Sequence, residues 1–443
     1  MISFVLLSCF AFAQVGSDDA PNSNPFEAWV SVSPRDEIRP VFETSPLGGP
    51  DETGSLIILA DEREGLVGSW THTLPVTGGK TYRFSSLRHT TGIDVARRTA
   101  EVRLLWQDST GQPVLRDEPT FPTYRPGDTP RAEPEYVHDG DTHANGWTEV
   151  AGVFAAPKAA TQMLIELNYH WEPSGRIEWT LPILEETDPI ASRKVRLATV
   201  HYCPTKGTTP ADKCEQFTPL IADAAKQRAD LVVLPETLTY FGTGLDFSVV
   251  AEPVPGPSTE FFGTLAKQHD LYIVAGLVER DRHLIYNVAV LIGPDGHVVG
   301  KYRKVTLPRG EVEAGITPGH EYPVFETRFG KVGMMVCYDG FFPEVARELS
   351  NNGAEVIAWP VWGCNPMLAQ ARACENHVWL VSSTYSDVSA NWMLSAIYDH
   401  AGQAVAKADT FGTVIVHEAD LSRPLYWQSL GDFKAQIEHH RPE

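Results

Sequence analysis

The pattern of apolar residues changes near residue 190, and this change divides the chain into two parts that fold differently. Before residue 190, short segments alternate between apolar and polar residues, as Ala100–Trp106, Thr148–Phe154 and Gln162–Asn168 do. Such alternation is typical of strands that bury one face, and Gly, Pro, Asn and Asp separate the segments. Because no clear helix interrupts them, we expect residues 14–190 to form an all-β sandwich of the jelly-roll type.

After a polar link at Glu185–Ser192, continuous apolar strands alternate with amphipathic helices. Helices are expected at Ala211–Arg228 and Phe342–Asn351. Strands are expected at Val195–Val200, Asp230–Pro235, Tyr272–Val278, Asn287–Ile292, Val332–Cys337 and Glu355–Trp359. Strands that are apolar on both faces need helices on both sides of their sheet. Residues 194–443 are therefore expected to form one α/β domain.

Length and charge agree with this division and exclude two classes of partner. The chain has 443 residues, more than one hydrophobic core usually accommodates, which favours two domains. Its formal net charge is −21, from 57 acidic and 36 basic residues. Nucleic acids and anionic membranes bind basic surfaces, so neither is expected as a partner. The acidity is explained by solubility.

The N-terminus resembles a short secretory signal peptide over residues 1–13. It is apolar and ends in Ala11-Phe12-Ala13, a small-x-small cleavage pattern, although no Lys or Arg precedes the apolar stretch. Cys9 offers a lipoprotein alternative, but Phe10 is a poor residue to follow a lipidated cysteine. Since no other segment has about 18 uninterrupted apolar residues, no membrane span is expected. A secreted or periplasmic location is predicted.

The six cysteines do not form a disulfide framework, because residues 15–202 contain none. In an exported protein Cys203 with Cys214, or Cys364 with Cys374, could form a bridge, and small buried thiols are the alternative. In either case Cys337 is left over. An unpaired cysteine in a secreted protein is a candidate reactive thiol.

Three segments of the α/β domain carry residue types suited to catalysis. Glu236 follows the buried strand Leu231–Leu234 and Pro235. The ends of such strands are where α/β proteins tend to build their sites. Burial raises a carboxyl pKa and makes it a usable general base. Lys304 lies in a basic segment among apolar residues, and its ammonium can stabilise an oxyanion. Taken singly, each is better explained as an ordinary solvated surface charge.

The third segment runs from an apolar strand into Cys337, then through a turn with Asp339 and Gly340 into a helix. This order is typical of a nucleophile elbow, in which the nucleophile is presented at the strand end. The backbone N–H of Tyr338 would then face a developing oxyanion. The N-terminus of the following helix is expected to lower the pKa of the thiol.

Together these segments resemble the nitrilase superfamily of carbon–nitrogen hydrolases, over about residues 194–443. The matching pieces are Leu234-Pro-Glu236, Tyr302-Arg-Lys304 with Leu307-Pro308, Val336-Cys-Tyr-Asp339 with Phe342-Pro343-Glu344, Gly315–Gly319, Ala373–Asn376 and Leu430–Asp432. The resemblance implies an α-β-β-α sandwich, no metal or cofactor, and catalysis by Glu236, Lys304 and Cys337. It also assigns the family's second glutamate to Glu311, with Glu313 the weaker choice.

The sequence Cys337-Tyr-Asp resembles the amidase and carbamoylase branches, since true nitrilases usually have Trp-Glu after the cysteine. The resemblance therefore implies hydrolysis of an amide or N-carbamoyl compound through a thioester. Thr306 is one departure, because the family often has His there. The β-rich domain is a larger departure, since most members lack it. The family tends to form homodimers, and the tail Tyr426–Pro442 looks suited to that.

Two other functions remain open. One is that the β-rich domain is a glycan- or surface-binding module, because Gly146–Leu184 loosely resembles carbohydrate-binding jelly rolls. The residues that carry this resemblance are Trp147, Pro157, Trp171 and Trp179. The same thioester could instead pass its acyl group to an amine acceptor. Pocket loops are expected at Thr237–Phe247 and Trp362–Met367.

A few residues outside the three segments allow two interpretations. His138, Asp139, Asp141 and His143 form either a metal site or a polar turn, and the polar turn is the better interpretation. Similarly, Tyr240, Trp359 and Trp362 either line the substrate pocket or belong to the core.

Overall fold

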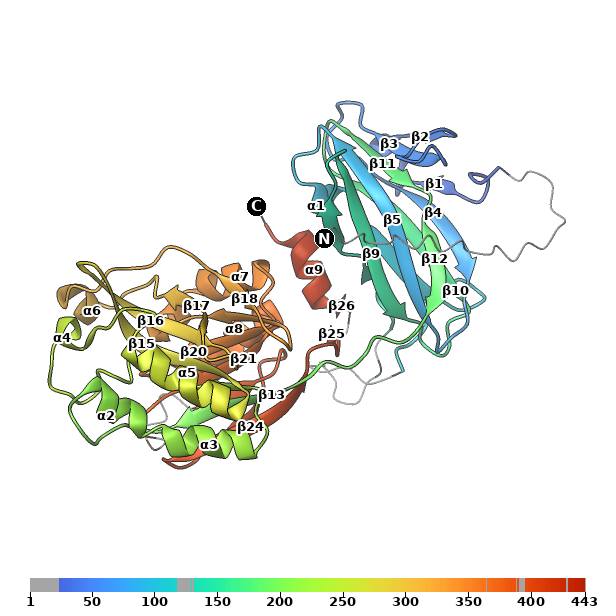
Figure 1. Ribbon diagram of the computed structural model, residues 1–443. Helices are drawn as coiled ribbons and strands as arrows, with labels where there is room; N and C mark the ends of the chain where they lie inside the picture. Colours follow the sequence, from blue (N-terminus) through green and yellow to red (C-terminus); the bar gives the residue numbers. More distant parts are fainter. Residues whose placement is uncertain are drawn as a thin grey trace, which may run out of the picture.

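The computed structural model describes residues 24–117, 129, 131–363, 365–387, 389, 395–427 and 429–442. The predicted signal peptide, residues 1–13, and Cys364 lie outside these residues. Figure 1 shows an all-β part and an α/β part, joined by the chain between β12 (Ile183–Thr187) and β13 (Lys194–His201). In the described part of the chain, no helix is long and apolar enough to cross a membrane.

The N-terminal part consists of two antiparallel sheets packed face to face. One has the order β1-β4-β10-β6-β7, formed by Val30–Val32, Val67–Pro75, Gln162–His170, Val102–Gln107 and Glu135–Tyr136. The other has the order β2-β3-β11-β5-β9-β8, formed by Val41–Ser45, Ser55–Leu59, Arg176–Thr180, Thr81–Thr91, Trp147–Ala155 and Asp139–Thr142, with β12 also on β5. Only the short η1 (Asp36–Ile38) and α1 (Ala96–Thr99) are helical here, among the described residues.

Alternating residues explain this sandwich. Along β6 the exposures alternate, so that Val102, Leu104 and Trp106 are fully buried between the sheets. Successive side chains of a strand point to opposite faces, and the inward set fills the core. The buried cluster contains aromatic residues from both sheets, including Trp106 of β6 and Trp179 of β11.

The α/β part has two six-stranded sheets with parallel centres. The first has the order β17-β16-β15-β14-β13-β24, with the remaining strands at Val298–Arg303, Leu284–Ile292, Tyr272–Asp281, Leu231–Val233 and Thr413–Asp420. The second has the order β18-β19-β20-β21-β22-β23, at Val324–Glu326, Lys331–Met334, Val356–Pro360, Trp379–Ser383, Ala396–Tyr398 and Ala404–Lys407. β13, β14 and β15 are mutually parallel, and so are β19, β20 and β21.

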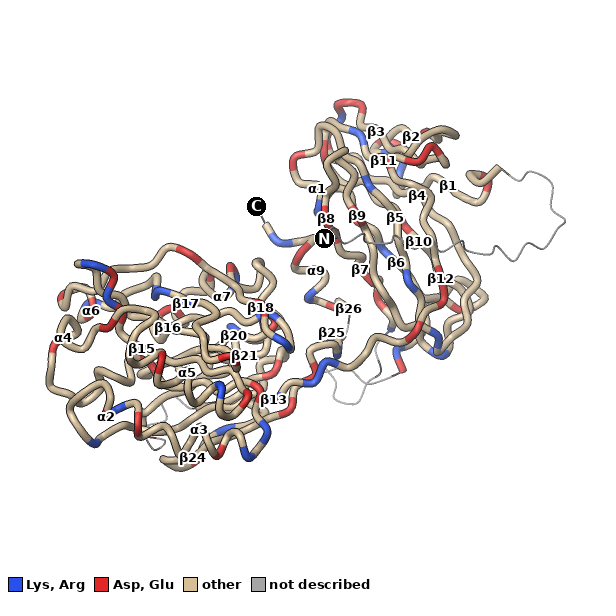
Figure 2. The backbone as a smooth tube through the Cα atoms, in the orientation of Figure 1, with Lys and Arg blue, Asp and Glu red and all other residues tan. Residues whose placement is uncertain are grey.

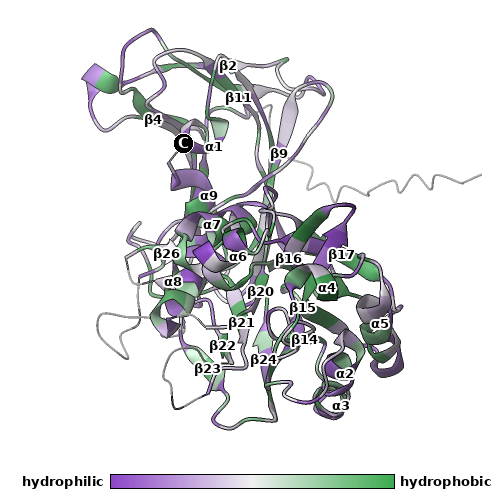
Figure 3. Ribbon diagram, turned by 90° about the vertical axis from the view of Figure 1, so that its left-hand side faces the viewer, coloured by the Kyte–Doolittle hydropathy of each residue, from purple (hydrophilic) through white to green (hydrophobic). Residues whose placement is uncertain are grey.

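Helices cover the outer face of each sheet. α2 (Pro210–Glu215), α3 (Thr218–Lys226) and α5 (Pro257–His269) pack on the first sheet, and α7 (Pro343–Asn351) and α8 (Pro366–Asn376) on the second. Apolar residues of both sheets meet in one core between them. Figure 3 shows α2, α3 and α5 on one side of the strands and α8 on the other. The expected α-β-β-α fold class is confirmed.

One predicted helix is wrong. Ala211–Arg228 was expected to be continuous, but it is broken into α2 and α3 around Phe217. Pro219 is the reason, because proline has no N–H to donate and its ring collides with the carbonyl of the preceding turn. It is tolerated in the first turn of α3, where backbone N–H groups have no partner in the helix.

The C-terminal tail lies between the two parts of the chain in Figure 1. It contains β25 (Tyr426–Trp427), β26 (Gly431–Asp432) and α9 (Phe433–His440). α9 contacts α1 and β7 of the sandwich. The tail, which the family resemblance suggests for a dimer interface, therefore makes these contacts within its own chain.

Candidate functional site

The predicted catalytic residues follow strands that end at one edge of the two sheets. Glu236 comes after β14, Lys304 directly after β17, and Cys337 after β19. Parallel strands present their carboxyl ends at the same edge, so residues far apart in the sequence meet there. The remaining helices of the domain, α4 (Phe247–Val250) and α6 (Arg309–Glu313), belong to the connecting segments.

The ammonium group of Lys304 joins the two predicted glutamates. Its Nζ donates to Oε1 of Glu236 at 2.9 Å and to Oε1 of Glu311 at 2.6 Å, and the lysine side chain is fully buried. Asn287 Nδ2 donates to the same two oxygens, at 2.7 and 3.1 Å. Burial alone would lower the pKa of Lys304, but Glu236, Cys337 and Glu311 outweigh burial and raise it. The lysine therefore stays charged.

Glu311 is the glutamate brought to this site, as the resemblance implies. It lies in the first turn of α6, and burial raises its pKa against the opposing charge of Lys304. Its Oε2 is buried without a hydrogen-bond partner among the described residues. Glu313 is exposed instead and pairs with Arg309 at 2.7 Å.

Cys337 is a free thiol at the start of the 3-10 helix η2 (Cys337–Phe341). Its Sγ donates to the carbonyl of Gly363 at 3.6 Å. Its backbone φ is 40°, a left-handed conformation that non-glycine residues adopt rarely and at a cost. Thr237, directly after Glu236, has a φ of 41°. Sharp turns of this kind aim side chains away from the strand ends and into a site.

The expected lowering of the thiol pKa is wrong. Burial raises the pKa of Cys337, and the carboxylate of Glu236 raises it further, while Lys304 and the backbone at Gly363 and Trp362 oppose them. The 3-10 helix that begins at Cys337 is only five residues long, so few aligned peptide dipoles offset the loss of water. The thiol is therefore protonated at neutral pH.

Two further residues support the nucleophile turn. Asp339 is fully buried and accepts hydrogen bonds from the Tyr302 hydroxyl at 2.8 Å and the Val336 backbone at 2.9 Å. Burial raises the pKa of Asp339 despite these donors. Trp359 Nε1 donates to the carbonyl of Cys337 at 3.3 Å. Trp359 is fully buried, so it belongs to the core beneath the turn.

The other predicted pocket residues differ in exposure. Trp362 is 57% exposed, and its carbonyl accepts a hydrogen bond from the Thr384 hydroxyl at 2.8 Å. Tyr240 is half-buried and stacks on Phe247 with ring centres 3.9 Å apart. Tyr385, which follows β21, was missed by sequence reasoning because no motif marks it; both Glu236 and Cys337 act on its phenol electrostatically.

The remaining described cysteines are also free thiols. Cys203 is half-buried, and Cys214 is buried with its Sγ 3.5 Å from the hydroxyl of Ser258. The Cys203–Cys214 bridge is therefore not formed. Cys374 is a free thiol as well, and its suggested partner Cys364 lies outside the described residues.

The histidine and aspartate cluster near residue 140 consists of separate pairs. His138 pairs with Glu438 at 2.6 Å, Asp139 with Arg88 at 2.6 Å, and His143 with Glu149 at 3.0 Å. Side chains that face different partners do not converge on one point, as metal ligands must. This arrangement favours the polar-turn interpretation.

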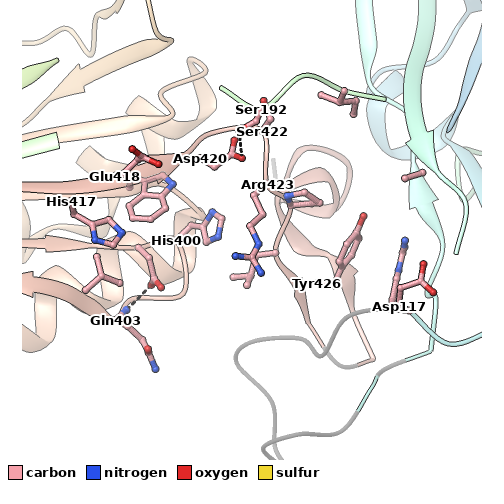
Figure 4. A pocket seen from close by; sticks show the side chains of 18 of the residues that line it. Asp117, Ser192, His400, Gln403, His417, Glu418, Asp420, Ser422, Arg423 and Tyr426 are labelled. Carbon is pink, nitrogen blue, oxygen red and sulfur yellow. Dashed lines mark hydrogen bonds between the residues drawn. The ribbon is translucent and has the colours of Figure 1, made fainter. Parts of the chain in front are cut away.

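A cavity of about 880 Å³ lies elsewhere, between the sandwich and the α/β part. Figure 4 shows Asp117 reaching it from the sandwich side, opposite His400, His417 and Arg423. One of its acidic groups, Asp420, accepts a hydrogen bond from the Ser192 hydroxyl at 2.6 Å. None of the predicted catalytic residues lines this cavity.

Figure 2 shows acidic and basic residues scattered over both parts of the chain.

Comparisons with known proteins find several that are similar to this chain. A nitrilase of Pyrococcus abyssi is 41% identical over 191 residues, which span 41% of this chain and 69% of that protein. An omega-amidase of Xenopus laevis is 32% identical over 251 residues, spanning 51% and 87%. Among solved structures, Saccharomyces cerevisiae Nit3, a member of branch 10 of the nitrilase superfamily, has 26% identity and a TM-score of 0.46 over 52% of this chain and 90% of its own. An amidase from Nesterenkonia sp. has 22% identity and a TM-score of 0.46, over 52% and 91%.

The sequence model of the carbon–nitrogen hydrolase family matches residues 159–425, more than half of the chain. The matched region contains the strands that present Glu236, Lys304 and Cys337, and it confirms the resemblance seen in the sequence. The chain therefore belongs to the carbon–nitrogen hydrolase family.

Proposed function

We propose that this protein hydrolyses the carbon–nitrogen bond of an amide or N-carbamoyl compound through a thioester on Cys337. One observation carries the proposal: a fully buried lysine ammonium lies between Glu236 and Glu311, beside a free thiol on which Glu236 and Lys304 act electrostatically. A buried cluster of charged groups is rarely explained by stability alone, because removing charges from water costs several kcal/mol per ion. Clusters of this kind are typical of catalytic sites.

Glu236 is the proposed general base. The raised pKa of Cys337 means that its proton has to leave as the sulfur attacks the carbonyl carbon. Lys304 and Asn287 both donate to Oε1 of Glu236, so Oε2 is the oxygen assigned to proton transfer. The proton moves from the thiol to Glu236 while the new carbon–sulfur bond forms.

Lys304 and the backbone N–H of Tyr338 are the proposed oxyanion donors. The attack places a negative charge on the former carbonyl oxygen, and a fixed ammonium in a dry site stabilises it strongly. Removing one such donor typically lowers the rate by about 100- to 1,000-fold. Glu311 is proposed to hold Lys304 in place, since its carboxylate accepts a second hydrogen bond from the ammonium, at 2.6 Å.

Collapse of the tetrahedral intermediate completes the first half of the reaction. Glu236 returns its proton to the leaving nitrogen, the carbon–nitrogen bond breaks, and ammonia or an amine departs. Glu236 then takes a proton from water, whose oxygen attacks the thioester carbon. The carbon–sulfur bond breaks, the acid is released, and the thiol regains a proton.

The test compares two cysteine variants. Cys337→Ala should abolish ammonia release while leaving the folded circular-dichroism spectrum and the melting temperature unchanged. Cys374→Ala removes another half-buried free thiol of the same domain and should keep full activity. Ammonia release by Cys337→Ala at the wild-type rate would refute the assignment.

The substrate class needs its own measurement. The relatives are named for nitrilase and omega-amidase activities, so primary amides, N-carbamoyl compounds and nitriles form the panel for ammonia release. We expect turnover of amides or N-carbamoyl compounds and none of nitriles. Added hydroxylamine distinguishes acyl transfer, because a transferase would convert the thioester mainly to a hydroxamate.

Glycan binding by the sandwich receives less support. Most of its described tryptophans are buried, including Trp70, Trp147 and Trp179, whereas glycan platforms present aromatic faces to solvent. Trp171 is the exception, at 51% exposure, and its ring stands near the guanidinium of Arg98. A pull-down on insoluble polysaccharide tests this function.

A further inference from the structure

Tyr385 lies in the same group of strand ends as the proposed catalytic residues. It follows β21, the strand next to β20 in the second sheet, and it is buried. Its ring centre is 4.3 Å from that of Phe241, in the loop that follows Glu236. The aromatic pair joins the loop of one sheet to the end of the other. The position of the phenol is therefore set by packing from both sheets.

Hydrogen bonds also fix the backbone around this tyrosine relative to the thiol. The preceding residue, Thr384, donates through its hydroxyl to the carbonyl of Trp362 at 2.8 Å and through its backbone to Ser395 at 2.9 Å. The residue after Trp362 is Gly363, whose carbonyl accepts from Cys337 Sγ. Tyr385 and Cys337 are thus attached to the same short segment.

The surroundings of the phenol define what its hydroxyl can do. The side chains of Thr237, Glu236 and Cys337 all influence its pKa. Burial raises the pKa of Tyr385 well above the usual value for tyrosine, and Glu236 and Cys337 add to the rise. The phenol is therefore protonated at neutral pH, and its hydroxyl can both donate and accept hydrogen bonds.

The two sides of the reacting carbonyl have different requirements. The oxygen side needs donors, which Lys304 and the Tyr338 N–H supply under the proposed function. The nitrogen side needs a group that returns a proton, which is Glu236, and a neutral acceptor for the amide N–H. Tyr385 packs on the loop that follows Glu236 and is linked through Thr384, Trp362 and Gly363 to Cys337, so its hydroxyl is suited to the nitrogen side.

We propose that Tyr385 is a further catalytic residue that forms the leaving-nitrogen subsite. Its hydroxyl oxygen accepts a hydrogen bond from the scissile amide N–H during acylation and holds the water that replaces the departed nitrogen. The proton transfers still run between Cys337, Glu236 and the nitrogen, so Tyr385 gains and loses none. This inference rests on the proposed function, because it assigns a role within the same reaction.

The experiment compares a primary amide with the methyl ester of the same acid, in the wild type and in Tyr385→Phe. Phenylalanine keeps the ring against Phe241 and removes only the hydroxyl. We expect kcat/KM for the amide to fall about 3- to 10-fold, the usual effect of losing one uncharged hydrogen bond. The methyl ester has no N–H on its leaving atom, so its kcat/KM should stay within about twofold.

Tyr286→Phe is the matched control, because Tyr286 is a buried tyrosine next to Asn287 whose ring packs on Arg303. Tyr286→Phe should leave kcat/KM unchanged for both the amide and the methyl ester. Equal losses on amide and ester in Tyr385→Phe would indicate a structural role and overturn the proposal, and so would an unchanged amide rate. Failure of the proposed function is distinct, since wild type and Cys337→Ala would then release ammonia equally.

Discussion

The carboxylate of Asp339 accepts two hydrogen bonds from Thr306, from its backbone nitrogen at 2.9 Å and from its hydroxyl at 2.6 Å, both at Oδ1. Thr306 is two residues beyond Lys304, and Asp339 is two beyond Cys337. The contact therefore ties the segment that carries the proposed oxyanion donor to the turn that carries the nucleophile. It also gives a structural role to the position where the family often has His.

Thr306→Val should weaken this link while keeping the side-chain volume. It removes the hydroxyl donor and leaves a buried carboxylate acceptor less satisfied, so we expect a loss of about 1–3 kcal/mol in the free energy of unfolding. The pKa of Asp339, already raised by burial, should rise further. Urea unfolding measures the first effect. Thr264→Val, which removes an exposed hydroxyl on α5, should cost less than about 0.5 kcal/mol.

Glu311→Gln should lower kcat, whereas Glu313→Gln should not. The first substitution removes one of the two carboxylates that bind Lys304 at 2.9 and 2.6 Å. The second removes an exposed partner of Arg309. Because Glu236 still holds the ammonium, we expect a fall of about 10-fold, below the 100- to 1,000-fold effect typical of a direct oxyanion donor. Steady-state kinetics on one amide decides it, and equal rates in both variants would contradict the role given to Glu311.

His377 should make stability depend on pH. Burial lowers its pKa from 6.5 to about 3, with His400, Lys434 and Arg347 adding to the effect, and its Nε2 accepts a hydrogen bond from Trp427 at 2.5 Å. The folded state keeps the ring neutral while the unfolded state takes up a proton below about pH 6.5. Stability is therefore full above that pH and is lost as pH falls toward the folded pKa.

The corresponding variant is His377→Asn, since asparagine tolerates the φ of 49° at this position. In the wild type, His377 contributes a loss of up to about 2 kcal/mol in the free energy of unfolding between about pH 7 and about pH 5, and the variant should lack this loss. Urea midpoints at the two pH values give the slope. His283→Asn removes an exposed histidine and should leave the slope as it is.

Arg97 should hold the C-terminal helix on the sandwich. Its guanidinium donates to the carbonyls of Glu438 at 3.1 Å, His439 at 3.2 Å and Arg441 at 3.0 Å, at the end of α9. Such a short helix is unstable alone, and a cation at its C-terminus satisfies carbonyls that lack partners. Arg97→Leu should therefore speed proteolytic cleavage within residues 426–442 by about 10-fold. Mass spectrometry of the fragments measures it, with the exposed Arg83→Leu as control.

Local pattern was enough to predict most elements and the residue types of the site. The alternation along Val102–Gln107 and the continuous apolar run at Leu231–Val233 are properties of neighbouring residues, so they can be read directly. Glu236, Lys304 and Cys337 were found because each lies at or within three residues of a strand end, inside a short motif. The break at Pro219 was also visible in the sequence, but the apolar spacing on either side outweighed it.

Only the tertiary structure decided how these groups act on one another. Asn287 and Tyr385 carry no motif, and Asp339 was read only as part of the turn after Cys337. Their contacts with Glu236, Thr306 and the surroundings of Cys337 arise because chain folding brings distant segments together. The pKa of the thiol depends on how much water is excluded and on which charge lies nearest, and here burial and Glu236 raise it although the sequence indicated a lower value. The sequence alone determined which chemical groups are available. Their distances and their desolvation depend on contacts between distant segments, which no local pattern contains.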